Sequence, residues 1–246
     1  MRKIKLSFVA MLLLGAVACT KIGHAPGITA NVSNAEAADM VTRSVSLNSN
    51  GVANVSDDAS SDASTYINEG LICGTVKSDT ISRHSPAGSA VTYSYNLTYN
   101  YVVNCNNNVL DNLTGSLAYS GSFSGPDLSS TNTGSTVFVL AGLSPHATDY
   151  VLNGEYKRAG TFQSKTDTTN HGTFNVDIVI TNLKITKPAR TIASGTATMV
   201  VTGSVPKKGT FSYTGTLVFN GDGTATLKIN GTLYTINLTA GTKVKV

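Results

Sequence analysis

The chain has no tryptophan, and only 13% of its residues are charged. Its only glutamates are Glu36, Glu69 and Glu155. A pair of catalytic carboxylates, as glycoside hydrolases use, would therefore have to come from scattered aspartates. No spacing between aspartates singles out such a pair, so the sequence contains no recognisable two-carboxylate site.

Motifs that hold phosphate, dinucleotides or catalytic zinc are absent as well. There is no GxSxG, no phosphate-binding glycine loop, no GxGxxG after a strand and no HExxH. The histidines are His24, His84, His146 and His171, and no two of them lie four residues apart. We therefore predict neither a metal site nor a cofactor.

Glycine, threonine, serine and asparagine are abundant, which is typical of β-structure with tight turns. Residues 92–105 read TYSYNLTYNYVVNC, in which apolar and polar residues alternate. Because successive side chains of a strand point to opposite faces, this pattern predicts a long strand with one tyrosine-rich face. We expect its tyrosines to be core residues, although they could instead line a cavity. The tyrosines concerned are Tyr93, Tyr95, Tyr99, Tyr101 and Tyr119.

Strand patterns follow one another from residue 66 onward, and no helix pattern separates them. This order excludes parallel βαβ units. We predict an all-β domain over residues 66–246, built as an antiparallel meander of about nine or ten strands. A sheet of that size is expected to form a sandwich or a barrel.

Two turns near the C-terminus predict strand register. The Asn230-Gly231 pair lies between two apolar runs and is typical of a two-residue type I′ hairpin, which pairs Leu227 with Tyr234. The preceding turn requires a loop with an odd number of residues. A loop with an even number would turn the apolar residues of one of the two strands toward the solvent. A loop over residues 220–222 pairs Leu217 with Ala225 and places Gly223 in the left-handed region.

Residues 1–18 are typical of a secretory signal, with three basic residues before a nearly all-apolar stretch. Ala16-Val17-Ala18-Cys19 resembles the lipobox of bacterial lipoproteins, in which the cysteine is lipidated and becomes the new N-terminus. The alternative is ordinary cleavage after Ala18, which leaves Cys19 a free thiol. Lipidation of Cys19 predicts attachment to a membrane without a transmembrane segment.

Removal of the signal changes the charge balance. The whole chain has 18 basic and 14 acidic residues, and 15 basic residues remain once the signal is gone. The basic isoelectric point therefore reflects targeting, and we predict no binding to nucleic acid.

The segment before the β domain divides into two parts. Residues 19–32 contain Gly23, Pro26 and Gly27 and are interpreted as a tether. Residues 33–65 are predicted to form a short helix and a Ser/Asp-rich loop. Ser33 and Glu36 have the spacing of a capping box, so we place the helix near residues 34–44 and the loop at 48–64.

Cys73 and Cys105 are the cysteines left after Cys19. Both lie in predicted strands of an exported protein, so we predict a disulfide between them. The alternative is two buried free thiols.

The signal MRKIKLSFVAMLLLGAVACTK, the Ser/Asp-rich segment and the late run FNGDGTATLKINGTLYTINLTAG together resemble uncharacterised lipoproteins of Bacteroidota. The resemblance implies a bacterial envelope protein held by lipid, at the outer membrane. It also implies O-glycosylation at Asp-Thr followed by an apolar residue or threonine, which points to Thr80 and Thr168. Surface export in this group is marked by an acidic run. Thr20-Lys21-Ile22-Gly23 follows Cys19 instead, so the periplasmic and surface faces both stay open.

These observations favour a non-catalytic envelope lipoprotein whose β domain is structural or binds a protein or small-molecule ligand. Its other partner is the membrane, through Cys19. The rival is a hydrolase of envelope or imported polymers that uses Asp149, Asp167 or Asp177 with a nearby histidine. A polar cleft with convergent aspartate and histidine would favour the hydrolase, and a closed tyrosine-lined cavity would favour ligand binding. A filled core would favour a structural or interaction role.

Overall fold

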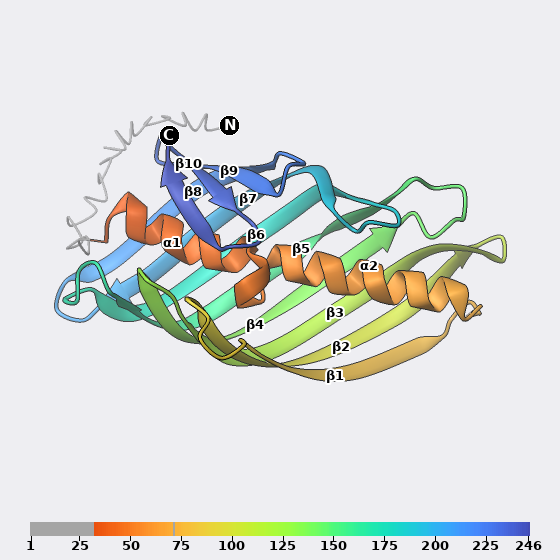
Figure 1. Ribbon diagram of the computed structural model, residues 1–246, viewed down its shortest axis with the longest axis horizontal. Coiled ribbons are helices and arrows are strands. Elements are labelled where there is room, and N and C mark those ends of the chain that lie inside the picture. The colour runs from red at the N-terminus through yellow and green to blue at the C-terminus, as the bar shows by residue number, and fades with distance from the viewer. Residues whose placement is uncertain (1–31, 71) are drawn as a thin grey trace, which may run out of the picture.

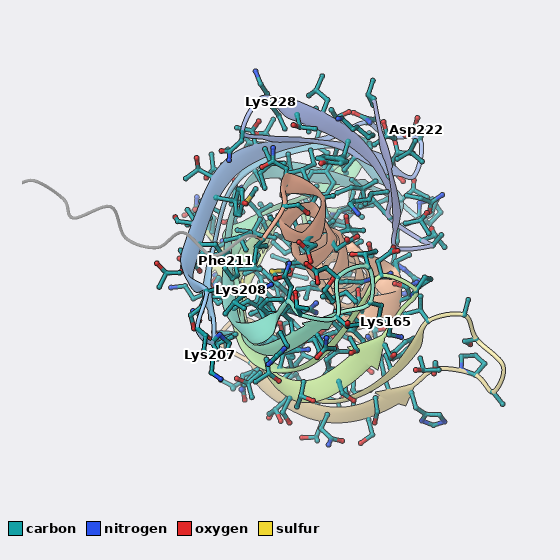
Figure 2. All side chains as sticks on the ribbon, turned by 90° about the vertical axis from the view of Figure 1, so that its left-hand side faces the viewer. Lys165, Lys207, Lys208, Phe211, Asp222 and Lys228 are labelled. Atoms are coloured by element: carbon teal, nitrogen blue, oxygen red, sulfur yellow. A yellow bond between two sulfur atoms is a disulfide. The ribbon has the colours of Figure 1, made fainter. Side chains whose placement is uncertain are left out.

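The computed structural model describes residues 32–70 and 72–246. Eleven strands form one antiparallel sheet, in which each strand pairs with the next along the chain from β1 to β11. Figure 1 shows this sheet curving around two helices, which follow one another along its concave side. Seen end-on in Figure 2, the helices lie inside the curl of the sheet. The predicted signal and the lipidation site Cys19 lie outside the described residues.

The elements have the following bounds. The helical part consists of α1 (Asn34–Val45), a 3₁₀ turn η1 (Leu47–Ser49) and α2 (Val52–Asn68). The strands are β1 (Val76–His84), β2 (Thr92–Asn106), β3 (Val109–Ser124), β4 (Leu128–Ala141), β5 (Asp149–Ser164), β6 (His171–Thr186), β7 (Ile192–Val205), β8 (Gly209–Phe219), β9 (Thr224–Ile229), β10 (Thr232–Asn237) and β11 (Thr242–Lys245).

The antiparallel meander is therefore confirmed, but it has eleven strands rather than nine or ten. The additional strand, β11, is four residues long and carries two lysines, so it lacks the apolar alternation that identified the others. The sheet also begins at Val76, ten residues later than the predicted domain boundary at residue 66, because helix α2 extends through Asn68. None of the helices in the described part of the chain is long and apolar enough to cross a membrane.

Helix α1 begins where the capping box predicts. The Ser33 hydroxyl accepts from the Glu36 backbone N–H at 3.2 Å, and the Glu36 carboxylate accepts from the Ser33 N–H at 2.9 Å. The two bonds satisfy backbone donors that the first turn of a helix leaves free. Met40 and Val41 are among the residues that α1 buries against the sheet.

The predicted loop over residues 48–64 is wrong, because most of it is helix α2. The buried residues of α2 recur at helical spacing, at Val52, Val55, Ala59 and Ala63. This spacing of small apolar residues is the sequence signal from which the helix could have been predicted. Serine and aspartate have low helix propensity and favour caps and turns, which made the segment resemble a loop. In the structure, the Ser56 hydroxyl instead donates to the Val52 carbonyl one turn back.

The tyrosine-rich face of β2 is core, as predicted, except at Tyr93, which is half-buried and lines a surface hollow of about 560 Å³. Tyr95, Tyr99 and Tyr101 are at most 2% exposed. Their neighbours across the sheet are often glycines: Tyr101 pairs with Gly115 of β3, which pairs with Phe138 of β4. A Cβ on Gly115 would lie 2.2 Å from the Phe138 ring, so the absence of a side chain makes room for the aromatic residue beside it. Bulky residues thus pack over bare backbone, which allows a dense core inside a curved sheet.

In the last two hairpins every side chain lies on the predicted face of the sheet. The register of one hairpin differs from the prediction. Leu227 pairs with Tyr234, and Asn230 and Gly231 both have positive φ, as a type I′ turn requires. The β8–β9 pairing is shifted by two residues from the prediction, since Leu217 pairs with Leu227 rather than with Ala225. A shift of two preserves the face of every side chain, so the same residues are buried. Gly223 has φ +80°, as expected for the left-handed region.

We expect Gly231→Val to destabilise the β9–β10 hairpin, because φ at this position is +77°. A branched side chain there costs about 1–2 kcal/mol, which corresponds to a melting temperature lower by roughly 2–8 °C for a domain of this size. Gly231→Asn is the matched control, because asparagine tolerates positive φ. Equal melting temperatures for the valine and asparagine variants, measured by circular dichroism, would contradict the turn assignment.

Candidate functional site

The most unusual side chain of the concave face is Arg158 of β5, which is 1% exposed. Its Nε donates to the Tyr119 hydroxyl at 3.1 Å. The guanidinium lies 5.6–6.0 Å from the ring centres of four aromatic residues. These rings belong to Tyr95, Tyr119, Phe123 and Tyr156. Aromatic faces attract a cation, and this attraction strengthens when both partners are removed from water.

The other donors of Arg158 bind the junction between the two helices. Its Nη1 donates to the Arg43 carbonyl at 2.8 Å, and its Nη2 donates to the carbonyls of Ser49 and Asn50. The Arg43 carbonyl belongs to the last turn of α1, where backbone acceptors lack helical partners and carry partial negative charge. A cation from the sheet therefore caps α1 and fixes the turn that leads into α2.

Tyr156 and Tyr119 extend this cluster. The Tyr119 hydroxyl donates to Tyr156 at 2.7 Å, and the Tyr156 hydroxyl donates to the Asn50 carbonyl at 2.8 Å. Gly134 lies between them on β4, and a Cβ there would come within 2.3 Å of the Tyr119 hydroxyl. The cluster is thus a closed polar network in which a glycine makes room for a tyrosine.

Helix α2 is attached to the sheet through Asp58, which is 9% exposed. Its carboxylate accepts from the Tyr99 hydroxyl at 2.5 Å and from the Arg83 guanidinium at 2.5 and 2.9 Å. Arg83 of β1 also donates to the Asn54 side chain. A buried carboxylate is tolerated when it is paired and hydrogen-bonded in this way. The sheet's first two strands therefore bind α2 directly.

Helix α1 has two further polar attachments. Asp39 pairs with Lys243 of the last strand, and both side chains are largely buried. The Glu36 carboxylate accepts from the Asn170 side chain at 3.0 and 3.1 Å, and Lys208 donates to the Asn170 oxygen at 2.7 Å. The two attachments connect α1 to β11 and to the β5–β6 loop.

The side chains of these clusters form hydrogen bonds and ion pairs that hold the helices on the sheet. Burial, followed by the neighbouring Asp58 carboxylate, raises the pKa of Tyr99, and burial raises the pKa of Tyr156. Both phenols therefore stay protonated at neutral pH and act as hydrogen-bond donors rather than bases. General acid–base catalysis requires a group whose pKa lies near the operating pH, and Tyr99 and Tyr156 do not meet that requirement.

Hollows occur at the rim and on the outer face of the sheet. One, of about 500 Å³, lies beside α2 and has Leu47, Ile192 and Leu238 among its apolar lining residues. Asp57 and Arg190 also line this hollow, and they form an ion pair with 3.1 Å between the Arg190 Nε and the Asp57 Oδ1. Another, of about 630 Å³, lies on the outer face. Its lining includes Val102, Val137, Val139 and Val179. Neither hollow has a histidine in its lining.

The residues considered for hydrolysis do not converge. Asp149 begins β5 and Asp167 follows the end of the same strand, so about 50 Å of extended chain separates them. Asp177 lies in the middle of β6, opposite Lys157. No hydrogen bond or ion pair joins His146 to Asp149 or His171 to Asp167 within the described part of the chain. Residues 32–70 and 72–246 also contain no group of three or more potential ligands that could hold a metal ion.

The two predicted features that lie on the β domain are both at its surface. Cys73 and Cys105 form a disulfide, which connects the segment after α2 to the end of β2. Thr80 on β1 and Thr168 in the β5–β6 loop are exposed, and both hydroxyls are therefore accessible to an enzyme. Whether they carry glycans stays a prediction that the structure does not test.

Sequence reasoning missed Arg158, Asp58 and Asp39. Lys157-Arg158 reads as an isolated basic pair, but strand alternation places Lys157 outside and Arg158 inside. A charged residue at an inward position between Tyr156 and Phe162 was the signal that could have identified it.

Comparisons with protein-family models, with curated proteins and with solved structures found no match to this chain.

We expect Arg158→Met to destabilise the protein by at least about 3 kcal/mol, because it removes the hydrogen bonds of a buried charged donor to three carbonyls and a phenol. The Arg43 and Asn50 carbonyls keep weaker, neutral donors in Ser49 and Tyr156. The matched control is Arg190→Met, which removes an exposed ion pair with Asp57 and should cost about 0–1 kcal/mol. Chemical denaturation of both variants measures the difference. Similar losses for the two would show that the buried network contributes little.

We expect Lys243→Met to cost about 3–5 kcal/mol at neutral pH, because it leaves the Asp39 carboxylate buried without its partner. Burial already raises the pKa of Asp39 above 3.8, and loss of Lys243 should raise it further. The folded state then binds a proton more readily than the unfolded state, so the deficit should shrink as pH falls through the folded pKa toward 3.8. A second change, Asp39→Asn, should remove this pH dependence. Denaturation at several pH values tests both statements.

Proposed function

We propose that this chain is a lipid-anchored protein of the bacterial cell envelope, with a non-catalytic β domain that has a structural or binding role. The observation that carries the proposal is the occupied concave face of the sheet. Helices α1 and α2 cover the buried tyrosines, and the polar tips of Tyr99, Tyr119 and Tyr156 bind partners within the chain. This arrangement favours a filled core and argues against a tyrosine-lined ligand cavity.

The dispersed acidic residues support the non-catalytic part of the proposal. Asp149, Asp167 and Asp177 lie at the two ends and the middle of the β5–β6 pair, on exposed or half-buried positions. A hydrolase needs its acid, base and nucleophile within reach of one bond. No observation favours the hydrolase, and a partner or ligand would contact the outer face or the rim hollows.

We also propose that the sheet forms an open barrel around the helices, rather than the two separate layers of a sandwich. The unbroken order of paired strands from β1 to β11 supports this, as does the single curl in Figure 2. Only one face of a curled sheet needs apolar cover, and the helices supply it. The outer face is then free to carry threonine, serine and asparagine.

The location of the protein is part of the same proposal. The lipobox at Cys19 supports an acyl anchor, and the disulfide between Cys73 and Cys105 fits an oxidising compartment outside the cytoplasm. We propose the outer membrane, on either its periplasmic or its surface face.

We expect Cys19→Ser to abolish acylation, and hence to release the protein from the membrane fraction after cell lysis. Thr20→Ala, which changes the neighbouring residue and leaves the lipobox intact, should fractionate as the wild type does. Mass spectrometry of the N-terminal peptide detects the acyl chains directly. An unmodified Cys19 in the mature wild-type protein would refute the anchor.

A further inference from the structure

Five lysines gather at the end of the sheet where α1 begins. They are Lys165, Lys207, Lys208, Lys228 and Lys245, here called the basic end. Figure 2 faces this end and labels four of the five, which extend from its turns and strands. Four are exposed and Lys208 is half-buried. None forms an ion pair within the described part of the chain, whereas Lys77, Lys157 and Lys243 do.

The chain enters the fold at the same end. The Val32 carbonyl accepts from the hydroxyl of Tyr213 on β8, and Val32 itself is 4% exposed. Strand β8 begins at Gly209, directly after Lys208. The N-terminal segment therefore enters the fold beside β8, the strand that follows the turn with Lys207 and Lys208.

The length of the segment before Val32 limits how far this end can lie from an anchor at Cys19. Val32 lies thirteen positions after Cys19. A flexible chain of that length has a mean end-to-end distance of roughly 20 Å, and a fully extended one spans at most about 45 Å. A lipid on Cys19 would thus hold the basic end, rather than the opposite end, close to the bilayer.

The acidic groups at this end are engaged within the protein. The Asp167 carboxylate accepts from the backbone N–H and the hydroxyl of Thr169, at 3.0 and 2.6 Å. Asp127 interacts electrostatically with the buried guanidinium of Arg43. The ammonium group of Lys165 donates only to a neutral partner, the Ser124 hydroxyl at 2.8 Å. Asp167 keeps its negative charge and interacts with Lys208, but the five lysines outnumber Asp127 and Asp167, so the surface is positive.

We propose that the basic end is a membrane-contact surface that takes the phosphate groups of anionic phospholipids. It would orient the β domain with its long axis away from the bilayer and its disulfide-bearing end outermost. The proposal rests on the proposed lipid anchor at Cys19. Clustered lysines close to a membrane surface are attracted by anionic lipids, and the attraction fades within a Debye length.

The test is a footprint of the acylated full chain, purified from membranes and reconstituted into vesicles. Two compositions are compared, phosphatidylcholine alone and phosphatidylcholine with 30% phosphatidylglycerol. A membrane-impermeant amine-acetylating reagent is applied, and mass spectrometry follows each lysine. On anionic vesicles we expect Lys165 and Lys207 to react at least threefold more slowly than on neutral ones. Lys184, an exposed lysine on the outer face of β6, should react equally on both.

Two variants sharpen the result. Lys207→Glu combined with Lys228→Glu, which leaves the bond of Lys208 to Asn170 intact, should abolish the protection of Lys165, whereas Lys184→Glu should leave it unchanged. High salt should also remove the protection, because the Debye length falls from about 10 Å at 0.1 M to about 3 Å at 1 M.

The outcomes separate the two proposals. A chain that does not float with the vesicles refutes the anchor and, with it, the membrane-contact surface. A chain that floats but reacts uniformly at all lysines refutes only the surface. Protection of the same lysines in whole envelopes, without protection on anionic vesicles, would mean that a protein occupies the basic end, and would also overturn the proposal.

Discussion

The structure depends on one buried cation. Arg158 extends from the middle of the sheet, and its donors bind carbonyls of Arg43, Ser49 and Asn50 at the junction of the helices. Each side of this contact supplies hydrogen-bond partners to the other. Without the helices, the guanidinium would keep only its bond to Tyr119, and without Arg158 the carbonyls of Arg43, Ser49 and Asn50 would each lose a charged donor. Helices and sheet therefore form one cooperative unit rather than a domain with an appended helical segment.

Local patterns predicted much of the fold, for reasons that particular residues show. The alternation of β2, the capping box of Ser33 and Glu36 and the Asn230-Gly231 turn each depend on neighbours within a few positions. Helix α2 could not be predicted in this way, because its stability comes from elsewhere. Asp58 is unfavourable in an isolated helix but is stabilised by Tyr99 and Arg83 of the sheet. The two-residue shift between β8 and β9 escaped prediction because alternation fixes the face of a strand and not its position along its neighbour.

The candidate site was predicted only in its apolar half. The tyrosines of β2 were expected to be buried, and Tyr95, Tyr99 and Tyr101 are, whereas Tyr93 is half-buried. The polar groups that meet them are single residues far apart in sequence: Tyr156 and Asn50 are separated by 106 positions. No local spacing announces such a pair. The basic end was likewise hidden, since its lysines, apart from the adjacent Lys207 and Lys208, are far apart in sequence and are brought to one end only by the turns of the meander.

The pairing of Asp39 with Lys243 has a consequence for biogenesis. Its members are 204 positions apart, so the first helix is translated early and its partner strand almost last. The concave face, likewise, is complete only when β11 has joined the sheet. Non-local contacts of this kind delay folding until most of the chain is present. A nascent chain with this topology cannot complete its core during synthesis. Under the export that we propose for this chain, that delay would keep it unfolded until it has crossed the membrane.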